Sequence, residues 1–167
     1  MRILELPLVS RTRRIHAMEH ATINILSQRY PYLSLVGRSD WQGFSIYGNV
    51  ASRQLEQAAH EALARLKAGE GHLALHPRCG TVLATTGLLS GLAAFVTLGL
   101  SGSRSRSRWA SLPNALLAAT LAVILGQPLG LLLQQRFTTD SRPGDLRIVQ
   151  VRHYLGGYLP LHRVEIR

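Results

Sequence analysis

Cysteine is nearly absent from this sequence of 167 residues, since Cys79 is the only one. A single thiol excludes an internal disulfide framework, so nothing in the sequence indicates an oxidising compartment. Acidic residues are also scarce: 9 Asp and Glu stand against 19 Lys and Arg, for a formal net charge of +10. A basic balance indicates an anionic partner, but no Arg- or Lys-rich run with interleaved aromatic residues occurs. We therefore expect a lipid bilayer as the partner and no nucleic acid.

Charge is absent altogether from two long runs, residues 82–100 and 112–135, of 19 and 24 residues. The hydrocarbon core of a bilayer, about 30 Å thick, is crossed by about 20 apolar residues in a helix. We predict that both runs are transmembrane helices and that residues 82–135 form a hairpin. A buried hairpin in a soluble core is the alternative, but two such runs exceed what so small a core could cover. We interpret the small residues of the first run as helix-packing positions: Gly87, Gly91 and Ala94.

Basic residues around the hairpin indicate its orientation. Seven of them flank it on the side of the two termini, and three lie in the short loop between the runs, where Trp109 suits a membrane interface. Because Lys and Arg are in excess on the cytoplasmic side, we predict a multi-pass protein of the bacterial inner membrane with cytoplasmic termini. The seven are Arg65, Lys67, Arg78, Arg136, Arg142, Arg147 and Arg152, and the three are Arg104, Arg106 and Arg108.

The remaining residues predict an α+β fold, a small cytoplasmic unit of helices and antiparallel strands that the transmembrane hairpin interrupts. In residues 1–81 the apolar spacing indicates a helix over 12–28 and an amphipathic helix over 51–69. The segments YPYLSLVG and WQGFSIYGN predict extended structure between them, and HLALH predicts a short extended piece. In residues 136–167, DLRIVQVRHYL and LHRVEI predict an antiparallel strand pair, which we expect to complete the sheet of the first unit.

The first predicted helix contains an H-x-x-E-H pattern made of His16, Glu19 and His20. Histidines four residues apart share a helix face, and two imidazoles at this spacing can bind one Zn²⁺ from one side. The glutamate lies within the same arc and can accept a proton from a water molecule that the metal acidifies. This order of residues is that of the inverzincins. Taken alone, the pattern fits a half-buried histidine pair hydrogen-bonded to its neighbours better than it fits a metal site.

A second pattern, His76 and Cys79 in the segment LALHPRCGT, shifts the interpretation toward a metal site. Imidazole and thiolate are both good zinc ligands, and two intervening residues let one loop supply both. The alternative is a buried cysteine beside an interfacial histidine at a membrane boundary. Glu70 and His72 are second-choice ligands or partners of ligands. The other histidines have no companion motif and are interpreted as solvated or sheet residues: His60, His153 and His162.

Together, the segments HAMEHATI and HPRCGT resemble the YqhQ-like family, bacterial membrane proteins of unknown function that are regarded as metal-dependent enzymes. The matching positions of the first motif are His16, Glu19, His20, Thr22 and Ile23, and those of the second are residues 76–81. The sequence departs from the family pattern at Ala17, Met18, Ala21, Val82 and Leu83. Because the metal-binding residue types are kept, the resemblance implies a metal site more strongly than it implies a particular reaction.

These patterns lead to one expected site and two expected functions. We expect one Zn²⁺ ion to be bound by His16, His20 and His76, with Cys79 as a fourth ligand or a poised neighbour. Glu19 is then the general base of a metal-dependent hydrolase that acts on a peptide or lipid-linked bond near the membrane surface. The alternative is a non-catalytic membrane protein in which the same residues form a closed structural or sensory site, since structural zinc is tetrahedral and closed. A membrane adaptor without a metal is the third possibility.

Overall fold

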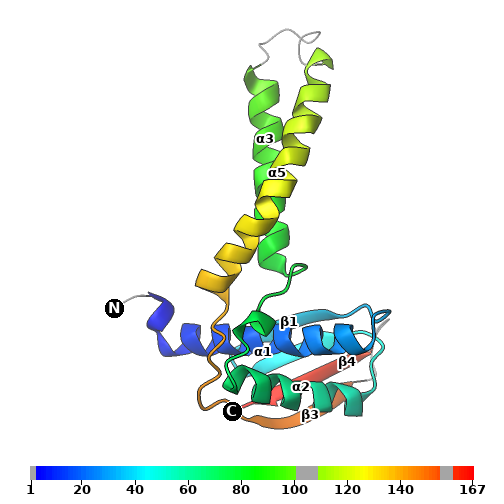
Figure 1. The fold of residues 1–167 in the computed structure, drawn as a ribbon, viewed down its shortest axis with the longest axis vertical. Coiled ribbons are helices and arrows are strands. Elements are labelled where there is room, and N and C mark those ends of the chain that lie inside the picture. The colour runs from blue at the N-terminus through cyan, green and yellow to red at the C-terminus, as the bar shows by residue number, and fades with distance from the viewer. Residues whose placement is uncertain (1–2, 101–108, 155–159) are drawn as a thin grey trace. The chain divides into compact units, whose positions relative to one another are not determined.

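The computed structural model describes residues 3–100, 109–154 and 160–167. These residues form a mixed α+β fold, as predicted. The chain divides into two compact units, Met1–His76 with Gln135–Arg167 and Pro77–Gln134. The first unit is a sheet with helices on it, and the second is a helical hairpin (Figure 1).

Four antiparallel strands form the sheet of the first unit, in the order β1-β2-β4-β3. The strands are β1 (Val36–Asp40), β2 (Gly43–Tyr47), β3 (Ile148–Tyr154) and β4 (Leu161–Ile166). Because β4 pairs with β2, the C-terminal strand pair completes the sheet that the N-terminal residues begin, as predicted. His153 and His162 lie opposite each other in that pair, which confirms that both are sheet residues.

Two helices, α1 (Pro7–Arg29) and α2 (Ser52–Lys67), cover one face of this sheet (Figure 1). A 3₁₀ turn, η1 (Ile3–Glu5), precedes α1. α1 begins before the predicted start at residue 12, since proline at the first helical position has the φ of a helix and needs no N–H partner. The predicted apolar stripe of α2 is buried, and Gly69, with a φ of 94°, follows the helix end. The core between helices and sheet includes Leu26, Phe44, Ile46, Leu55 and Val164.

The segment HLALH differs from its predicted extended structure, because Gly71–Ala74 form the 3₁₀ turn η2. Backbone groups of an extended segment need a neighbouring strand. Here the carbonyl oxygens of Leu73, Ala74 and Leu75 accept hydrogen bonds from side chains of α1 instead. The prediction of a short extended piece was therefore wrong.

The second unit consists of α3 (Gly80–Leu100) and α5 (Leu112–Leu133), after which the chain continues into the π turn η3 (Gln134–Thr138). Both helices are long and apolar enough to cross a membrane. Many of their large apolar side chains are exposed, among them Leu88, Phe95, Leu116 and Leu125. In a soluble core hairpin such side chains would be buried. The predicted loop arginines lie outside the described residues: Arg104, Arg106 and Arg108.

The two helices of the hairpin approach each other closely at glycines of α5. A Cβ atom added at Gly130 would lie 2.8 Å from the Cα atom of Val82, and Gly126 is similarly close to α3. Small residues with this spacing let helix backbones come together, as is typical of membrane helix pairs. The interpretation of Gly87 and Gly91 as packing positions was wrong, since a Cβ atom added at either would meet no atom within 4 Å.

Candidate metal centre

Helix α1 places His16 and His20 on one face, one turn apart. Their imidazole centroids lie 4.3 Å apart in an edge-to-face arrangement. His76, which follows η2, adds a third imidazole, whose ring centroid is 5.9 Å from that of His20. His20 is only 2% exposed, whereas His16 and His76 are half-buried. The first unit therefore gathers three of the four side chains that the sequence proposes as ligands.

Backbone carbonyl groups determine which nitrogen atom is the hydrogen-bond donor in two of these rings. The Nδ1 atom of His16 lies 3.0 Å from the carbonyl oxygen of Thr138, and that of His20 lies 2.8 Å from the carbonyl oxygen of Ala74. A carbonyl oxygen only accepts hydrogen bonds, so Nδ1 is the donor in both rings. A neutral imidazole with its proton on Nδ1 has its lone pair on Nε2. Metal-binding histidines in proteins are oriented by hydrogen bonds of this kind.

Asn24, one turn beyond His20 on the same face, holds η2 in place. Its side-chain amide donates to the carbonyl oxygens of Leu73 and Leu75, each at 2.9 Å. With the bond from His20 to Ala74, the three successive carbonyl oxygens of residues 73–75, at the end of η2, accept hydrogen bonds from α1. Because His76 follows directly, these bonds fix the backbone from which its imidazole extends.

The first half of α1 binds the segment that follows α5 in a similar way. The Nη2 atom of Arg13 donates to the carbonyl oxygens of Arg136, at 3.1 Å, and Thr139, at 2.9 Å. The backbone N–H of Asp140 donates to the carbonyl oxygen of Arg13 at 3.1 Å. Together with the bond from His16 to Thr138, these contacts fix residues 136–140 against α1.

Glu19 is also buried on α1, with 4% of its surface exposed. Its carboxyl group lies against the backbone of β1 at Gly37, where an added Cβ atom would be 2.1 Å from Oε1 of Glu19. Any side chain larger than hydrogen at position 37 would therefore displace this carboxyl group. The position of Glu19 depends on a glycine in a neighbouring strand as well as on the helix.

Cys79 belongs to the second unit, where its carbonyl oxygen accepts the first hydrogen bond of α3, from the N–H of Leu83 at 3.1 Å. Its thiol is buried. Three peptide units separate it from His76, so the Cα atoms of the two residues are at most about 11 Å apart. The chain itself keeps this thiol in the neighbourhood of the third imidazole.

Glu70 and His72, the second-choice ligands, do not join the three imidazoles in the contacts described above. The carboxylate of Glu70 accepts hydrogen bonds from Arg65, from Nε at 3.0 Å and from Nη2 at 2.6 Å. These bonds, more than the opposing effect of desolvation, lower the pKa of Glu70 below its usual value. His72 and His60 are exposed. Glu70, which was considered as an additional ligand, is therefore already hydrogen-bonded to Arg65.

Sequence reasoning missed four residues that contribute to this region. Asn24 could have been found, since it lies four residues after His20 and shares its helix face. The accepting carbonyl groups of Ala74 and Thr138 could not, because every residue has a carbonyl group and the sequence does not indicate its direction. Gly37 lies in a segment that the sequence predicts only as extended.

Comparison with known proteins places this chain among proteins of unknown function. The family model described as a domain of unknown function, DUF6391, matches residues 11–151. An uncharacterized protein of the cyanobacterium Picosynechococcus sp. is 34% identical over 161 residues, which cover 84% of this chain and 78% of that protein. No solved structure matches the chain. The family match includes most of α1, all of η2 and both helices of the hairpin, and the chain therefore belongs to the DUF6391 family.

Proposed function

We propose that the three imidazoles of the first unit bind a divalent metal ion, with zinc as the expected metal, and that Cys79 is either a fourth ligand of a closed site or a neighbour of an open one. The most direct support is the pair of hydrogen bonds from Nδ1 of His16 and His20 to backbone carbonyl groups. These bonds leave Nε2 of each ring as the atom that can bind a metal. His16, His20 and Cys79 are side chains of the types that hold zinc in proteins.

The donor set fits zinc better than it fits calcium or magnesium, which prefer oxygen ligands. Two imidazoles that bind one tetrahedral zinc ion through Zn–N bonds of 2.0–2.1 Å have ring centroids about 5 Å apart. The centroid distances of 4.3 Å and 5.9 Å lie on either side of this value. Each distance is therefore compatible with two neighbouring rings that bind the same ion.

The proposed reaction is hydrolysis of a peptide or lipid-linked bond near a membrane surface, with Glu19 as the general base. A bound zinc ion supplies Lewis-acid polarisation and acidifies water. Glu19 is a buried carboxyl group one turn from His16, and Gly37 leaves room for it. Its role would be to accept a proton from the attacking water molecule.

A closed structural or sensory metal site is the second candidate. It is favoured by the same hydrogen bonds, because His16 and His20 each fix a backbone segment that connects to the hairpin. In this alternative the metal stabilises the fold of residues 71–76 and 136–140 against α1. The two candidates differ in whether Cys79 is needed to hold the metal, since a catalytic zinc keeps one open position.

We further propose that the hairpin spans the bacterial inner membrane with both termini in the cytoplasm. The excess of basic residues on the terminal side supports this orientation. The resemblance of HAMEHATI and HPRCGT to the YqhQ-like family supports a membrane protein with a metal site.

Element analysis of the detergent-purified protein tests the proposal, beginning with His16→Ala and His76→Ala, which should lose the bound zinc. Glu19→Gln should keep zinc and thermal stability, because an amide occupies the same volume as the carboxyl group. It should abolish hydrolysis in a screen of peptide and lipid-linked substrates, because an amide cannot accept the proton. Glu56→Gln, an exposed change on α2, is the matched control and should leave zinc content, thermal stability and hydrolysis unchanged.

The variant Cys79→Ser separates the two candidate functions. A hydrolase with an open position should keep most of its zinc in this variant, whereas a closed structural site should lose it. Loss of zinc from Glu19→Gln as well would exclude the general-base role. A wild-type protein that purifies without any transition metal, even after incubation with zinc, would exclude both candidates.

A further inference from the structure

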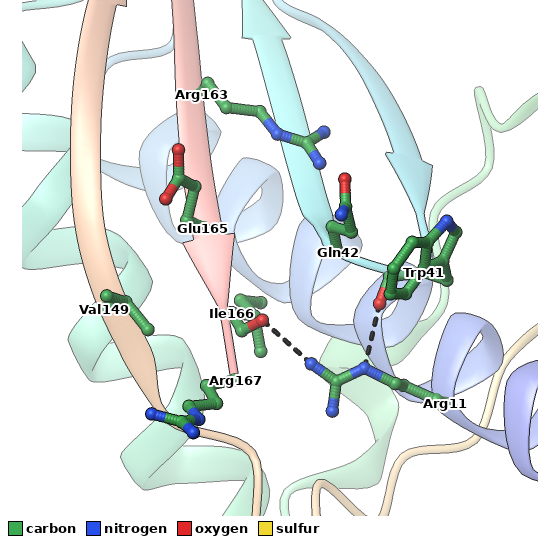
Figure 2. A pocket seen from close by; sticks show the side chains of 8 residues that line it. All are labelled: Arg11, Trp41, Gln42, Val149, Arg163, Glu165, Ile166 and Arg167. Atoms are coloured by element: carbon green, nitrogen blue, oxygen red, sulfur yellow. Dashed lines mark hydrogen bonds between the residues drawn. The ribbon is translucent and has the colours of Figure 1, made fainter.

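A pocket of about 420 Å³ opens in the first unit, where the start of α1, the β1–β2 turn and the ends of β3 and β4 meet (Figure 2). Its lining includes three arginines, one carboxylate and the indole ring of Trp41. A volume of this size is typical of small-molecule sites. From this lining we propose that the pocket binds a phosphate group, carried by a soluble small molecule or by a lipid headgroup. The proposal does not depend on the metal centre.

The guanidinium group of Arg11 is held in the pocket wall by two backbone carbonyl groups (Figure 2). Its Nε atom donates to the carbonyl oxygen of Trp41 and its Nη2 atom to that of Ile166, both at 2.8 Å. Carbonyl groups accept hydrogen bonds without carrying a formal charge, so they fix the cation in position and do not neutralise it. A guanidinium group has five N–H donors, and the two carbonyl groups use two of them. The other donors suit the geometry of a phosphate group.

The carboxylate in the pocket lining, Glu165, is already engaged by other groups. It forms an ion pair with Arg152 at 3.2 Å and accepts a hydrogen bond from the side chain of Gln150 at 2.5 Å. Arg152 does not line the pocket. The negative charge of Glu165 is therefore balanced from outside and does not cancel the arginines of the lining.

Two of the three arginines supply the uncompensated charge. Arg163 donates to a carboxylate oxygen of Asp40 at 2.7 Å, which neutralises it. Among the described residues no carboxylate forms an ion pair with Arg11 or Arg167. The pocket therefore offers two unpaired guanidinium groups to an anion.

The indole ring of Trp41 provides an apolar surface beside these cations. It lies in the β1–β2 turn and is 53% exposed. The turn is fixed by Asp40, whose Oδ1 atom accepts hydrogen bonds from the backbone N–H groups of Gln42, at 2.8 Å, and Gly43, at 3.1 Å. A pocket that joins fixed cations to an apolar ring suits a phosphate ester whose organic part contacts the ring.

Tryptophan fluorescence tests the proposal directly, because the protein has only two tryptophans. In the full-length variant Trp109→Phe, purified in neutral detergent, Trp41 is the only source of the signal. Phenyl phosphate should produce a saturable change that excess inorganic phosphate reverses, and benzyl alcohol should not. A short-chain phosphatidic acid is titrated in parallel. Tighter binding of phenyl phosphate would support a soluble phosphate ester, and tighter binding of phosphatidic acid would support a lipid headgroup.

Charge-removing variants in the same background show whether the arginines bind the phosphate. Arg11→Gln and Arg167→Gln should each weaken phenyl phosphate binding by about tenfold or more. Arg11 also connects α1 to the sheet, so Arg167→Gln is the decisive variant. The backbone of Arg167 keeps its hydrogen bonds with Arg147 in that variant, which should fold normally. Arg53→Gln, an exposed change on α2, is the control and should bind as tightly as the parent.

Two results would overturn the proposal. The first is the absence of a saturable signal with both phenyl phosphate and the short-chain phosphatidic acid. The second is equal affinity of folded Arg167→Gln and Arg53→Gln for phenyl phosphate. Neither result would bear on zinc binding by the histidines.

Discussion

His20 donates a hydrogen bond from Nδ1 to the carbonyl oxygen of Ala74, 2.8 Å away and 54 residues later in the chain. Both groups are buried, so this bond forms where water cannot replace it. The same ring lies beside those of His16 and His76, where we propose the metal centre, with Nε2 as its ligand atom. One side chain thus has two separable roles, a structural one at Nδ1 and a proposed ligand role at Nε2.

The first prediction separates these two roles of His20. The amide nitrogen of asparagine lies close to the position of Nδ1, so His20→Asn should keep most of the hydrogen bond to Ala74 but lose the ligand atom. His20→Ala should lose both and lower the free energy of unfolding by about 1–3 kcal/mol more than His20→Asn does. Thermal unfolding and zinc content of the two variants check this. Zinc retained by His20→Asn would contradict the ligand role, and equal stability would contradict the structural one.

The second prediction concerns Asn24, which we expect to position His76 through η2. Asn24→Ala removes two hydrogen bonds to buried backbone segments and should lower the free energy of unfolding by about 1–3 kcal/mol. It should also weaken zinc binding by about 10–100-fold, the usual effect of removing a group that orients a ligand. Zinc titration and thermal unfolding measure the two effects. Asn49→Ala, an exposed change, is the control, and a variant with normal zinc affinity would show that η2 does not need this support.

How far the sequence alone predicts this structure depends on whether the determining contacts are local. The face shared by His16 and His20 follows from helical spacing, and the C-terminal strand pair follows from its apolar alternation, so both were predicted. The turn η2 was not, because the donors that bind its carbonyl groups come from α1, 49 to 54 residues earlier.

The pocket around Arg11 also depends on contacts between distant segments, which the local sequence does not predict. Arg11 and Ile166, which it contacts, are separated by 155 residues, and the sequence near either one has no motif. The space for Glu19 at Gly37 likewise depends on how a helix meets a strand. Patterns within one element predicted the candidate ligands, whereas the groups that orient them come from distant segments.

The third prediction concerns the orientation of the hairpin. Reporter fusions after residue 103, between the two predicted spans, and after residue 167 should give opposite results if the hairpin crosses the membrane once in each direction. The fusion after residue 167 should report a cytoplasmic position, because seven basic residues flank the hairpin on that side and three lie in the loop. Equal signals from the two fusions would contradict a transmembrane hairpin.

The fourth prediction concerns the contact between α3 and α5. Gly130→Ala places a methyl group within 2.8 Å of the backbone of Val82, so the helices must separate. We expect a loss of about 1–3 kcal/mol in hairpin stability. Gly87→Ala is the matched control, since it adds the same group where no atom lies within 4 Å and should be neutral or slightly stabilising. Helical circular dichroism during heating in detergent measures both. Equal unfolding temperatures would contradict the close approach at Gly130.

The fifth prediction is a pH dependence that arises from His162. This side chain is 1% exposed, its Nε2 atom lies 3.1 Å from the hydroxyl group of Ser52, and its ring stacks on His153 with centroids 4.4 Å apart. Burial, and to a smaller extent the nearby charge of His153, lower the pKa of His162 below its ordinary value of 6.5. The folded state therefore binds fewer protons at this site than the unfolded state when the pH falls below about 6.5.

It follows that His162 stabilises the fold fully above pH 6.5 and progressively less as the pH falls toward its lowered pKa. The loss should approach about 1.4 kcal/mol for each pH unit within this range. Between pH 5 and 6.5 the carboxyl groups with lowered pKa values, such as Asp40, stay ionised in both states and add no slope. The measurement is the difference in slope between wild type and His162→Gln in urea unfolding, because this difference isolates the contribution of His162. His60→Gln, an exposed change, should keep the wild-type slope. If His162→Gln keeps that slope too, protonation of His162 does not control the acid sensitivity of the first unit.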